Sequence, residues 1–303
     1  MSMRRGQALT GLLFILPAII FLSVFLIYPT IWTILLSFND GRGLKFSEWV
    51  GFENYINLFT NDPKFLDLSN FPPTGAVFNN VLWVIFNTIF CVSLGLLIAV
   101  LADRVKYERI VKAIVFLPMA IAATAVAIIW LFVYSPNPDI GLLNAIITFF
   151  NKDFEPIAWT GRADTVNAAL IVANIWTSTG FAMVVLSAAL KGIPTEIIEA
   201  SRVDGAKEFQ VFRHITVPML SLAISVVTIT LIINVLKVFD IIYIMTLGGP
   251  GSASRVLAYT MYAETFQGGK AGYGSAVAVI LLILVIPIMA LNIRRFRSEG
   301  VAR

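Results

Sequence analysis

Six runs of mostly apolar residues alternate with shorter, more polar segments along the chain. Each run is long enough to cross about 30 Å of hydrocarbon as an α-helix, which rises about 1.5 Å per residue. The pattern therefore predicts an all-α membrane protein that forms a single domain over 1–303, with six transmembrane helices. The predicted spans lie at about 9–37, 79–102, 111–134, 167–190, 215–237 and 274–293.

The first run follows a short basic start, MSMRRGQ, and so has the outline of a secretory signal. A cleaved signal has an apolar core of about 7–15 residues. This run continues to about Leu36. We therefore interpret it as a retained first span.

The composition fits a membrane protein, with 58% hydrophobic and 13% charged residues, whereas soluble proteins carry about 25% charged residues. The net charge of +4 is modest and does not indicate a nucleic-acid partner. Cys91 is the one cysteine and His214 the one histidine. An internal disulfide is thus impossible, and no cysteine–histidine metal cluster is expected.

The basic residues are concentrated in alternate segments. The termini and the second-to-third and fourth-to-fifth links hold 14 of the 22 Lys and Arg residues. Because basic residues collect on the cytoplasmic side, this bias predicts cytoplasmic termini and cytoplasmic links there. The residues concerned are Arg4, Arg5, Arg104, Lys106, Arg109, Lys112, Lys191, Arg202, Lys207, Arg213, Arg294, Arg295, Arg297 and Arg303.

The loop at 39–78 is predicted to lie outside the cytoplasm. Trp49, Phe52, Ile56 and Phe59 recur in it at helical spacing. One apolar helical face of this kind suits a helix lying at the membrane interface. A small extracytoplasmic cap without a partner is the alternative.

A dense polar patch, EASRVDGAKEFQVFRHITVP at 199–218, interrupts the apolar pattern. Pro194 suits the first turn of a short helix that runs to about Val203, and Asp204 with Gly205 indicates a turn. A second helix is expected from about Ala206 into the fifth span. The segment 191–214 is thus predicted to be a helix–turn–helix at the cytoplasmic face. Its exposed charged and aromatic groups fit either a docking element or a solvated loop.

The spacing in this patch resembles the EAA signature of permease subunits of binding-protein-dependent ABC importers. That signature is E-A-A, three residues, G, nine residues and I-x-L-P. The sequence matches it with two mild departures, Ser201 for Ala and Val217 for Leu. In the family, this loop inserts into a groove on a cytoplasmic ATPase. The coupling residues implied are Glu199, Ala200, Ser201, Asp204, Gly205, Phe209 and Phe212.

The resemblance extends over nearly the whole chain. Four segments look like carbohydrate importers of the maltose-importer class: 51–65, 87–104, 114–130 and 236–251. The segment at 13–38 is similar to the first of their two unlike permease subunits. Segments 71–80, 140–146 and 180–194 resemble the α-glucoside or glucosylglycerol branch. Unlike the maltose permease, this chain lacks two extra N-terminal spans and a large inserted outer domain.

The resemblance implies a subunit of a larger importer in the cytoplasmic (inner) membrane of a bacterium or archaeon. Its partners would be a second permease subunit in a heterodimer, two ATPase subunits that bind ATP and Mg²⁺, and an extracytoplasmic sugar-binding protein. The sequence contains no G-x-x-x-x-G-K-[ST] phosphate loop, and GGPGSASR at 248–255 is interpreted as a turn. With no catalytic constellation either, we expect no enzyme activity and no cofactor or metal in this chain.

A sugar path requires polar side chains that face the bundle interior, because polar groups facing lipid are costly. Residues at i, i+3, i+4 and i+7 share one helical face. Interhelical hydrogen bonds are the alternative role for such groups. The family's cavity is lined by the helices beside the cytoplasmic loop, which favours the fourth and fifth spans over the second. The fourth span offers Asn174, Thr177, Ser178 and Phe181; the fifth offers Thr230, Asn234, Lys237 and Asp240; the second offers Trp83, Asn87 and Phe90.

Two other transporter classes compete with a sugar ABC permease. A secondary sugar transporter would be expected to carry intramembrane carboxylates, but Asp240 lies near the end of a span. An ABC permease for amino acids or peptides would share the EAA pattern but not the segments at 51–65 and 236–251.

Overall fold

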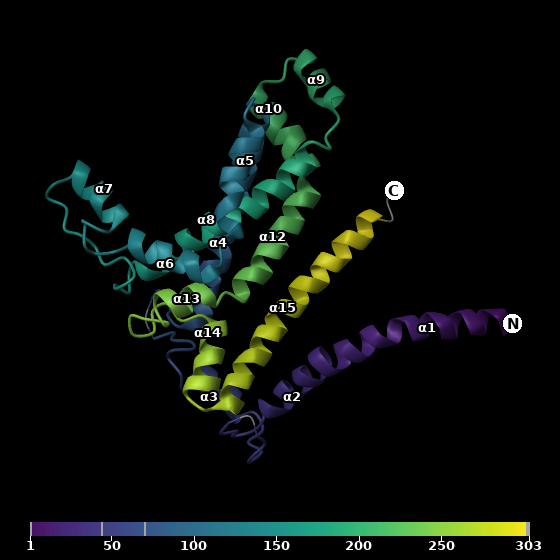
Figure 1. Ribbon diagram of the computed structural model, residues 1–303, viewed down its shortest axis with the longest axis vertical. Coiled ribbons are helices and arrows are strands. Elements are labelled where there is room, and N and C mark those ends of the chain that lie inside the picture. The colour runs from purple at the N-terminus through teal and green to yellow at the C-terminus, as the bar shows by residue number, and fades with distance from the viewer. Residues whose placement is uncertain (1, 44, 70, 301–303) are drawn as a thin grey trace. The chain divides into compact units, whose positions relative to one another are not determined.

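The computed structural model describes residues 2–43, 45–69 and 71–300 (Figure 1). Over these residues the chain forms helices and no strands beyond three isolated bridges, which confirms the predicted fold class. The segments group into two compact units. One contains the residues up to Asn61 together with Thr260–Leu282, and the other contains Asp62–Tyr259 together with the residues from Ile283 on.

Four helices of the described chain are long and apolar enough to cross a membrane: Leu13–Leu36, Ala76–Asp103, Val166–Leu190 and Ala271–Arg294. Two further helix pairs meet the same criterion only as bent pairs. The described residues therefore contain up to six spans, at the places where the sequence predicts them. The count of six stays a prediction, because it depends on treating each bent pair as one span.

The first unit begins with three helical segments that follow one another directly: α1 (Ser2–Leu22), the π-helix η1 (Ser23–Ile27) and α2 (Tyr28–Leu36). The loop that follows α2 is held by Asn54 of α3 (Glu53–Thr60). Asn54 Nδ2 donates to the carbonyls of Ser37 and Asn39, both at 2.9 Å. The C-terminal part of the unit holds the end of α14 (Leu257–Tyr262), η4 (Ala263–Gln267) and the start of α15 (Ala271–Gly300).

The predicted interfacial helix is shorter than its apolar pattern. α3 begins only at Glu53, so Trp49 and Phe52 precede it, and Trp49 instead pairs with Asn39 in an isolated bridge. The expectation of one helix carrying all four apolar residues is therefore wrong. Each of Trp49, Phe52, Ile56 and Phe59 is nevertheless more than half exposed. The apolar surface exists, but a loop and a two-turn helix build it together.

The core of the second unit is the contact between α4 (Ala76–Asp103) and α8 (Val166–Leu190). Gly95 allows these helices to meet, because a Cβ added there would lie 2.6 Å from the Cβ of Ala182 and 2.9 Å from the backbone N of Met183. Small residues at crossings permit such close approach in membranes. The buried cluster around this contact comprises Cys91, Ala99, Ala182, Met183, Leu186, Val227 and Leu231.

Two of the predicted spans are broken. The helix through Glu108–Ala120, made of α5 (Glu108–Phe116) and η2 (Leu117–Ala120), meets α6 (Ala123–Val133) at 102°. Ile121 and Ala122 are extended at this break. The helix through Glu208–Met219 meets α12 (Ser221–Leu236) at 67°. Pro118 and Pro218 lie within three residues of the breaks, and a proline lacks the N–H that continues a helix.

The loop between α6 and α8 contains α7 (Leu142–Phe150) and is organised by one buried amide. Asn144 donates from Nδ2 to the carbonyls of Ser135 at 2.7 Å and Ile157 at 2.9 Å. Its Oδ1 accepts from the backbone N of Ile157 and from Trp159 Nε1, both at 3.1 Å. All of its hydrogen-bonding capacity is therefore used inside the loop.

Candidate functional site

A cavity of about 430 Å³ lies within the second unit, where the two bent helix pairs face α8. The α8 wall carries Asn174, Thr177, Ser178 and Phe181. These four occupy i, i+3, i+4 and i+7 of a regular helix, so they lie on one face. The structure brings together all four residues that the sequence predicts for this span.

The end of α12 and the start of α13 (Asp240–Met245) form the opposite wall with Asn234, Lys237 and Asp240. Lys237 terminates α12, and Asp240 begins α13. Thr230 is the one residue offered by the fifth span that does not line the cavity. Its hydroxyl donates to the carbonyl of Val226 at 2.8 Å, which is a local helix contact.

A third wall was not predicted from the sequence. The bend between η2 and α6 contributes Pro118, Met119 and Ile121, followed by Ala123 and Val126 of α6. Pro118 beside a run of small residues is the one sequence signal that points to a break there. Phe239, between Lys237 and Asp240, also lines the cavity and stacks on Tyr243 with 5.2 Å between ring centroids.

In the second-span stripe, the alternative role of an interhelical hydrogen bond is found for Asn87. Trp83 and Asn87 of α4 are fully buried. Asn174 Nδ2 donates to Asn87 Oδ1 at 2.8 Å. Asn87 is thus an interhelical partner, and Asn174 both joins the helices and reaches the cavity. Phe90 lines a separate groove of about 700 Å³ with mostly apolar walls.

The cavity offers chemistry suited to a polyhydroxylated molecule. Amide and hydroxyl groups can donate to and accept from hydroxyls. The phenyl rings of Phe181 and Phe239 provide apolar faces, while Lys237 and Asp240 contribute one charge of each sign. Among the described residues, no group of three or more His, Cys, Asp or Glu could hold a metal ion.

The 191–214 loop forms two short helices, as the sequence predicts. α9 spans Thr195–Val203 and α10 spans Glu208–Val211, followed by the π-helix η3 (Phe212–Thr216) and α11 (Val217–Met219). Pro194 caps α9 with extended backbone rather than entering its first turn. α10 begins two residues later than expected, where Gln210 Oε1 accepts from the backbone N of Lys207 at 2.8 Å.

Gly205 supplies the turn between the two helices. Its φ is +85°, and nothing lies within 4 Å of an added Cβ. Side chains disfavour this left-handed region. The backbone N of Ala206 donates to the carbonyl of Ser201 at 3.0 Å, which closes the end of α9. Glycine is therefore required by backbone conformation and not by a crowded neighbour.

The loop presents both polar and apolar groups to its surroundings. Glu199, Ala200 and Asp204 are exposed, and Phe209 is 69% exposed. Phe212 is half-buried, and Ser201 is half-buried with its hydroxyl bonded to the carbonyl of Ile198 at 2.7 Å. The predicted coupling residues thus lie on one loop, and most of them are open to a partner.

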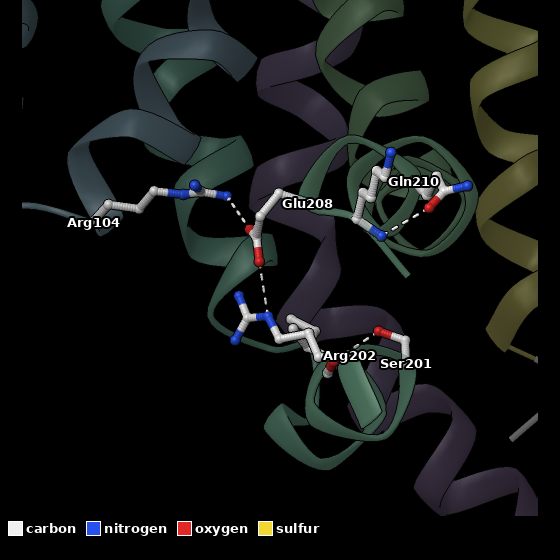
Figure 2. A network of polar contacts seen from close by, with 7 residues as sticks. Arg104, Ser201, Arg202, Glu208 and Gln210 are labelled. Atoms are coloured by element: carbon white, nitrogen blue, oxygen red, sulfur yellow. Dashed lines mark hydrogen bonds and ion pairs between the residues drawn. The ribbon is translucent and has the colours of Figure 1, made fainter. Parts of the chain in front are cut away.

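Two carboxylates organise the charges around this loop. Glu208 accepts from Arg104 at 2.8 Å and from Arg202 at 2.9 Å, and these contacts lower its pKa, with Arg202 the larger cause (Figure 2). Glu108 pairs with Lys112 and, at 2.6 Å, with Lys191. Hydrogen bonds from these two ammonium groups, Lys112 first, lower the pKa of Glu108 to about 2.

Comparisons with known proteins place this arrangement in context. The family model of the inner membrane component of binding-protein-dependent transport systems matches residues 91–296. The osmoprotective compounds uptake permease protein GgtC of Synechocystis sp. is 47% identical, over 95% of this chain and 99% of that protein. The alpha-glucoside transport system permease protein AglF of Rhizobium meliloti is 41% identical, over 99% of this chain and 86% of that protein.

The fold is similar to a chain of a bacterial ABC transporter involved in the import of the acidic polysaccharide alginate. The TM-score is 0.77, with 24% sequence identity and 97% of each chain covered. At this identity the likeness concerns the fold alone.

Proposed function

The chain belongs to the family of inner membrane components of binding-protein-dependent transport systems, and from this premise we propose which cargo it carries and how it is driven. It is the transmembrane subunit of an ATP-driven importer of di- or oligosaccharides or glycosides, and it forms half of the translocation pathway. The cavity in the second unit carries this proposal, because seven of the eight residues that the fourth and fifth spans offer for a sugar path line it.

The names of the relatives support a sugar cargo. They include permeases for alpha-glucosides, for trehalose and maltose, and for lactose. The cavity volume of about 430 Å³ falls within the range of roughly 300–1,000 Å³ found for small-molecule sites. Its amide and hydroxyl groups and its phenyl faces suit a glycoside. Because Lys237 and Asp240 would also pair with a free amino acid, the names of the relatives, and not the charges of the cavity, favour a sugar.

Energy would come from outside this chain. We propose that the 191–214 loop lies at the cytoplasmic face and engages one of two ATPase subunits, which bind ATP and Mg²⁺. The other partners are a second, unlike permease subunit and an extracytoplasmic sugar-binding protein. Both termini would then be cytoplasmic. The side chains of Arg4, Arg5, Arg295, Arg297 and Arg303, on which part of this orientation rests, lie outside the described residues.

Reconstitution of the complete complex in proteoliposomes tests the proposal. We expect uptake of at least one sugar from a labelled panel of trehalose, maltose, sucrose and glucosylglycerol. This uptake should require ATP on the side of the membrane that carries the ATPase subunits. Uptake driven by an ion gradient without ATP would establish a secondary transporter instead. ATP-driven uptake of amino acids but of no panel sugar would move the cargo to another class.

Variants of the cavity link the uptake to the site. Asn234→Leu and Thr177→Leu each remove a polar group that lines the cavity, and a lost hydrogen bond to a buried partner costs roughly 1–3 kcal/mol. We expect uptake to fall while the ATPase subunits still co-purify. Thr230→Val is the matched control, since Thr230 bonds within its own helix. Equal uptake in all three variants would exclude this cavity from the path.

A further inference from the structure

One carboxylate joins the 191–214 loop to a part of the chain that is far away in sequence. Glu208 is the first residue of α10, and it accepts from Arg202 of α9 and from Arg104, the C-cap of α4 (Figure 2). Arg104 and Glu208 are separated by 104 residues. The loop's two short helices and the end of α4 therefore meet on a single side chain.

The link from α4 to α5 is held on its other side as well. Glu108, the first residue of α5, pairs with Lys191, the C-cap of α8, and with Lys112 one turn later. Lys112 also donates to the hydroxyl of Ser187 on α8. The side chains of Lys112 and Glu108 are only 19% and 24% exposed, so these contacts are screened less by solvent than the pairs of Glu208.

We propose that Glu208 is a positioning residue that delivers movement of the 191–214 loop to α4 and α5. The chain itself connects this loop only to α8 on one side and to α12 on the other. The Arg104–Glu208 contact connects the loop to a third segment, the link at 104–107 between α4 and α5. From this link, α5 leads directly to Pro118 and Met119 on the cavity wall. This inference rests on the proposed function, in which an ATPase moves the loop.

Exposed ion pairs contribute little to stability, since both partners are well solvated in isolation. The side chains of Arg104, Arg202 and Glu208 are all about half exposed. Removal of Arg104 should therefore leave the fold and the assembly intact. The substitution should instead change the number of sugar molecules imported per ATP hydrolysed. A small change in the free-energy difference between two conformations of the transporter is enough to alter this ratio.

A simpler role for Glu208 is local. A negative charge in the first turn of a helix is favourable, and Glu208 occupies that position in α10. Substitution of Glu208 alone cannot separate the two roles. Substitution of Arg104 can, because it removes the tie to α4 and leaves Glu208, its helix and its bond to Arg202 in place.

The experiment uses the complete reconstituted complex and the panel sugar that it imports fastest. The readout is sugar molecules imported per ATP hydrolysed, beside the yield of complex. Arg104→Glu places a like charge against Glu208, while Arg104→Lys keeps the positive charge. Lys106→Glu is the matched control, because Lys106 lies two residues away on the same link and forms no ion pair with a described residue.

We expect Arg104→Glu to lower the imported sugar per ATP by about fivefold or more, since like charges at a contact repel. Arg104→Lys should keep about half of the wild-type ratio or more. Lys106→Glu should stay close to wild type. The triple variant R104E/R202Q/E208R restores an ion pair of reversed polarity and should recover much of the loss, although it places a cation at the start of α10.

Two results would overturn the inference while leaving the proposed function standing. One is the same sugar-to-ATP ratio for Arg104→Glu and Lys106→Glu. The other is no recovery in the triple variant at normal complex yield. Failure of the wild-type complex to import any panel sugar with ATP would instead reject the proposed function itself.

Discussion

The contact between α4 and α8 and the turn of the 191–214 loop each depend on a glycine, but for opposite physical reasons. Gly95 lies in a regular helix, and an added Cβ would meet Ala182 and the backbone of Met183 within 3 Å. Gly205 has open space around it and a φ of +85°. The first glycine is required by a neighbouring helix, and the second by its own backbone.

This difference separates what holds the helices together from what shapes the exposed 191–214 loop. A crowded helix crossing cannot yield without moving backbone, because the atoms that an added Cβ would meet are largely main-chain atoms. A turn with open surroundings can be strained while the helices beside it stay folded. The same substitution should therefore damage folding at one site and coupling at the other.

Gly95→Val should have the largest effect of the changes considered. Overpacking costs about 1–3 kcal/mol even where side chains can rearrange, and here the α8 backbone would have to move. We expect little monodisperse protein by size-exclusion chromatography of a fluorescent fusion. Gly95→Ala with Ala182→Gly should recover only part of the yield, because the backbone N of Met183 remains close. Full recovery would mean that the Ala182 methyl group alone sets the spacing.

Gly205→Val should leave the yield of folded complex near wild type and lower ATP-driven uptake by about tenfold. A β-branched residue is strongly disfavoured at positive φ, so the turn that orients α9 and α10 should change. Gly205→Asn is the matched control, since Asn tolerates this region far better. Equal loss of uptake in both variants would contradict a backbone cause and would indicate that any side chain blocks a partner there.

Local periodicity explains which parts of the site could be predicted. Asn174, Thr177, Ser178 and Phe181 share a face of one regular helix, and the cavity contains all four. The same reasoning failed for Thr230, because its hydroxyl donates a hydrogen bond to a carbonyl of its own helix. The turn at Gly205 was predictable for the same local reason that makes Asp-Gly a turn signal.

Features that depend on distant segments were not accessible from the pattern. The bend of 102° brings Pro118 and Ile121 to the cavity, although the hydropathy of 111–134 indicates one uninterrupted span. The Arg104–Glu208 pair joins residues with no local relation. Both depend on contacts with distant segments, and the hydropathy of one segment carries no information about such contacts.

Asn87→Leu and Asn234→Leu should separate packing from transport with a smaller effect. Asn87 is buried and accepts from Asn174, so its loss removes an interhelical hydrogen bond, which contributes about 0.5–1.5 kcal/mol. We expect a lower apparent midpoint of thermal unfolding for Asn87→Leu. Asn234 lines the cavity and is exposed there, so Asn234→Leu should unfold near the wild-type temperature and import less sugar. A lower midpoint for Asn234→Leu alone would reverse these assignments.

The smallest effect concerns Glu108, which lies between the two regions and joins α5 to the end of α8. Its pKa is lowered from 4.5 to about 2, chiefly by Lys112 and then by Lys191. A carboxyl group whose pKa is lower in the folded state stabilises that state above its unfolded pKa. The contribution is therefore complete above about pH 5 and is lost as the pH falls from about 4.5 towards 2.

We expect the apparent midpoint of the purified complex, at a fixed heating rate, to fall between pH 7 and pH 3.5 by slightly more in wild type than in Glu108→Gln. The difference should be only about 1–3 °C, because Lys112 keeps its hydrogen bond to Ser187 and the half-exposed Lys191 side chain is solvated by water. Glu155→Gln removes an exposed carboxylate that forms no ion pair with a described residue, and it should follow wild type. A larger fall of the midpoint in Glu108→Gln than in wild type would be a difference of the opposite sign. It would mean that Glu108 does not stabilise the junction of α5 and α8 through its charge.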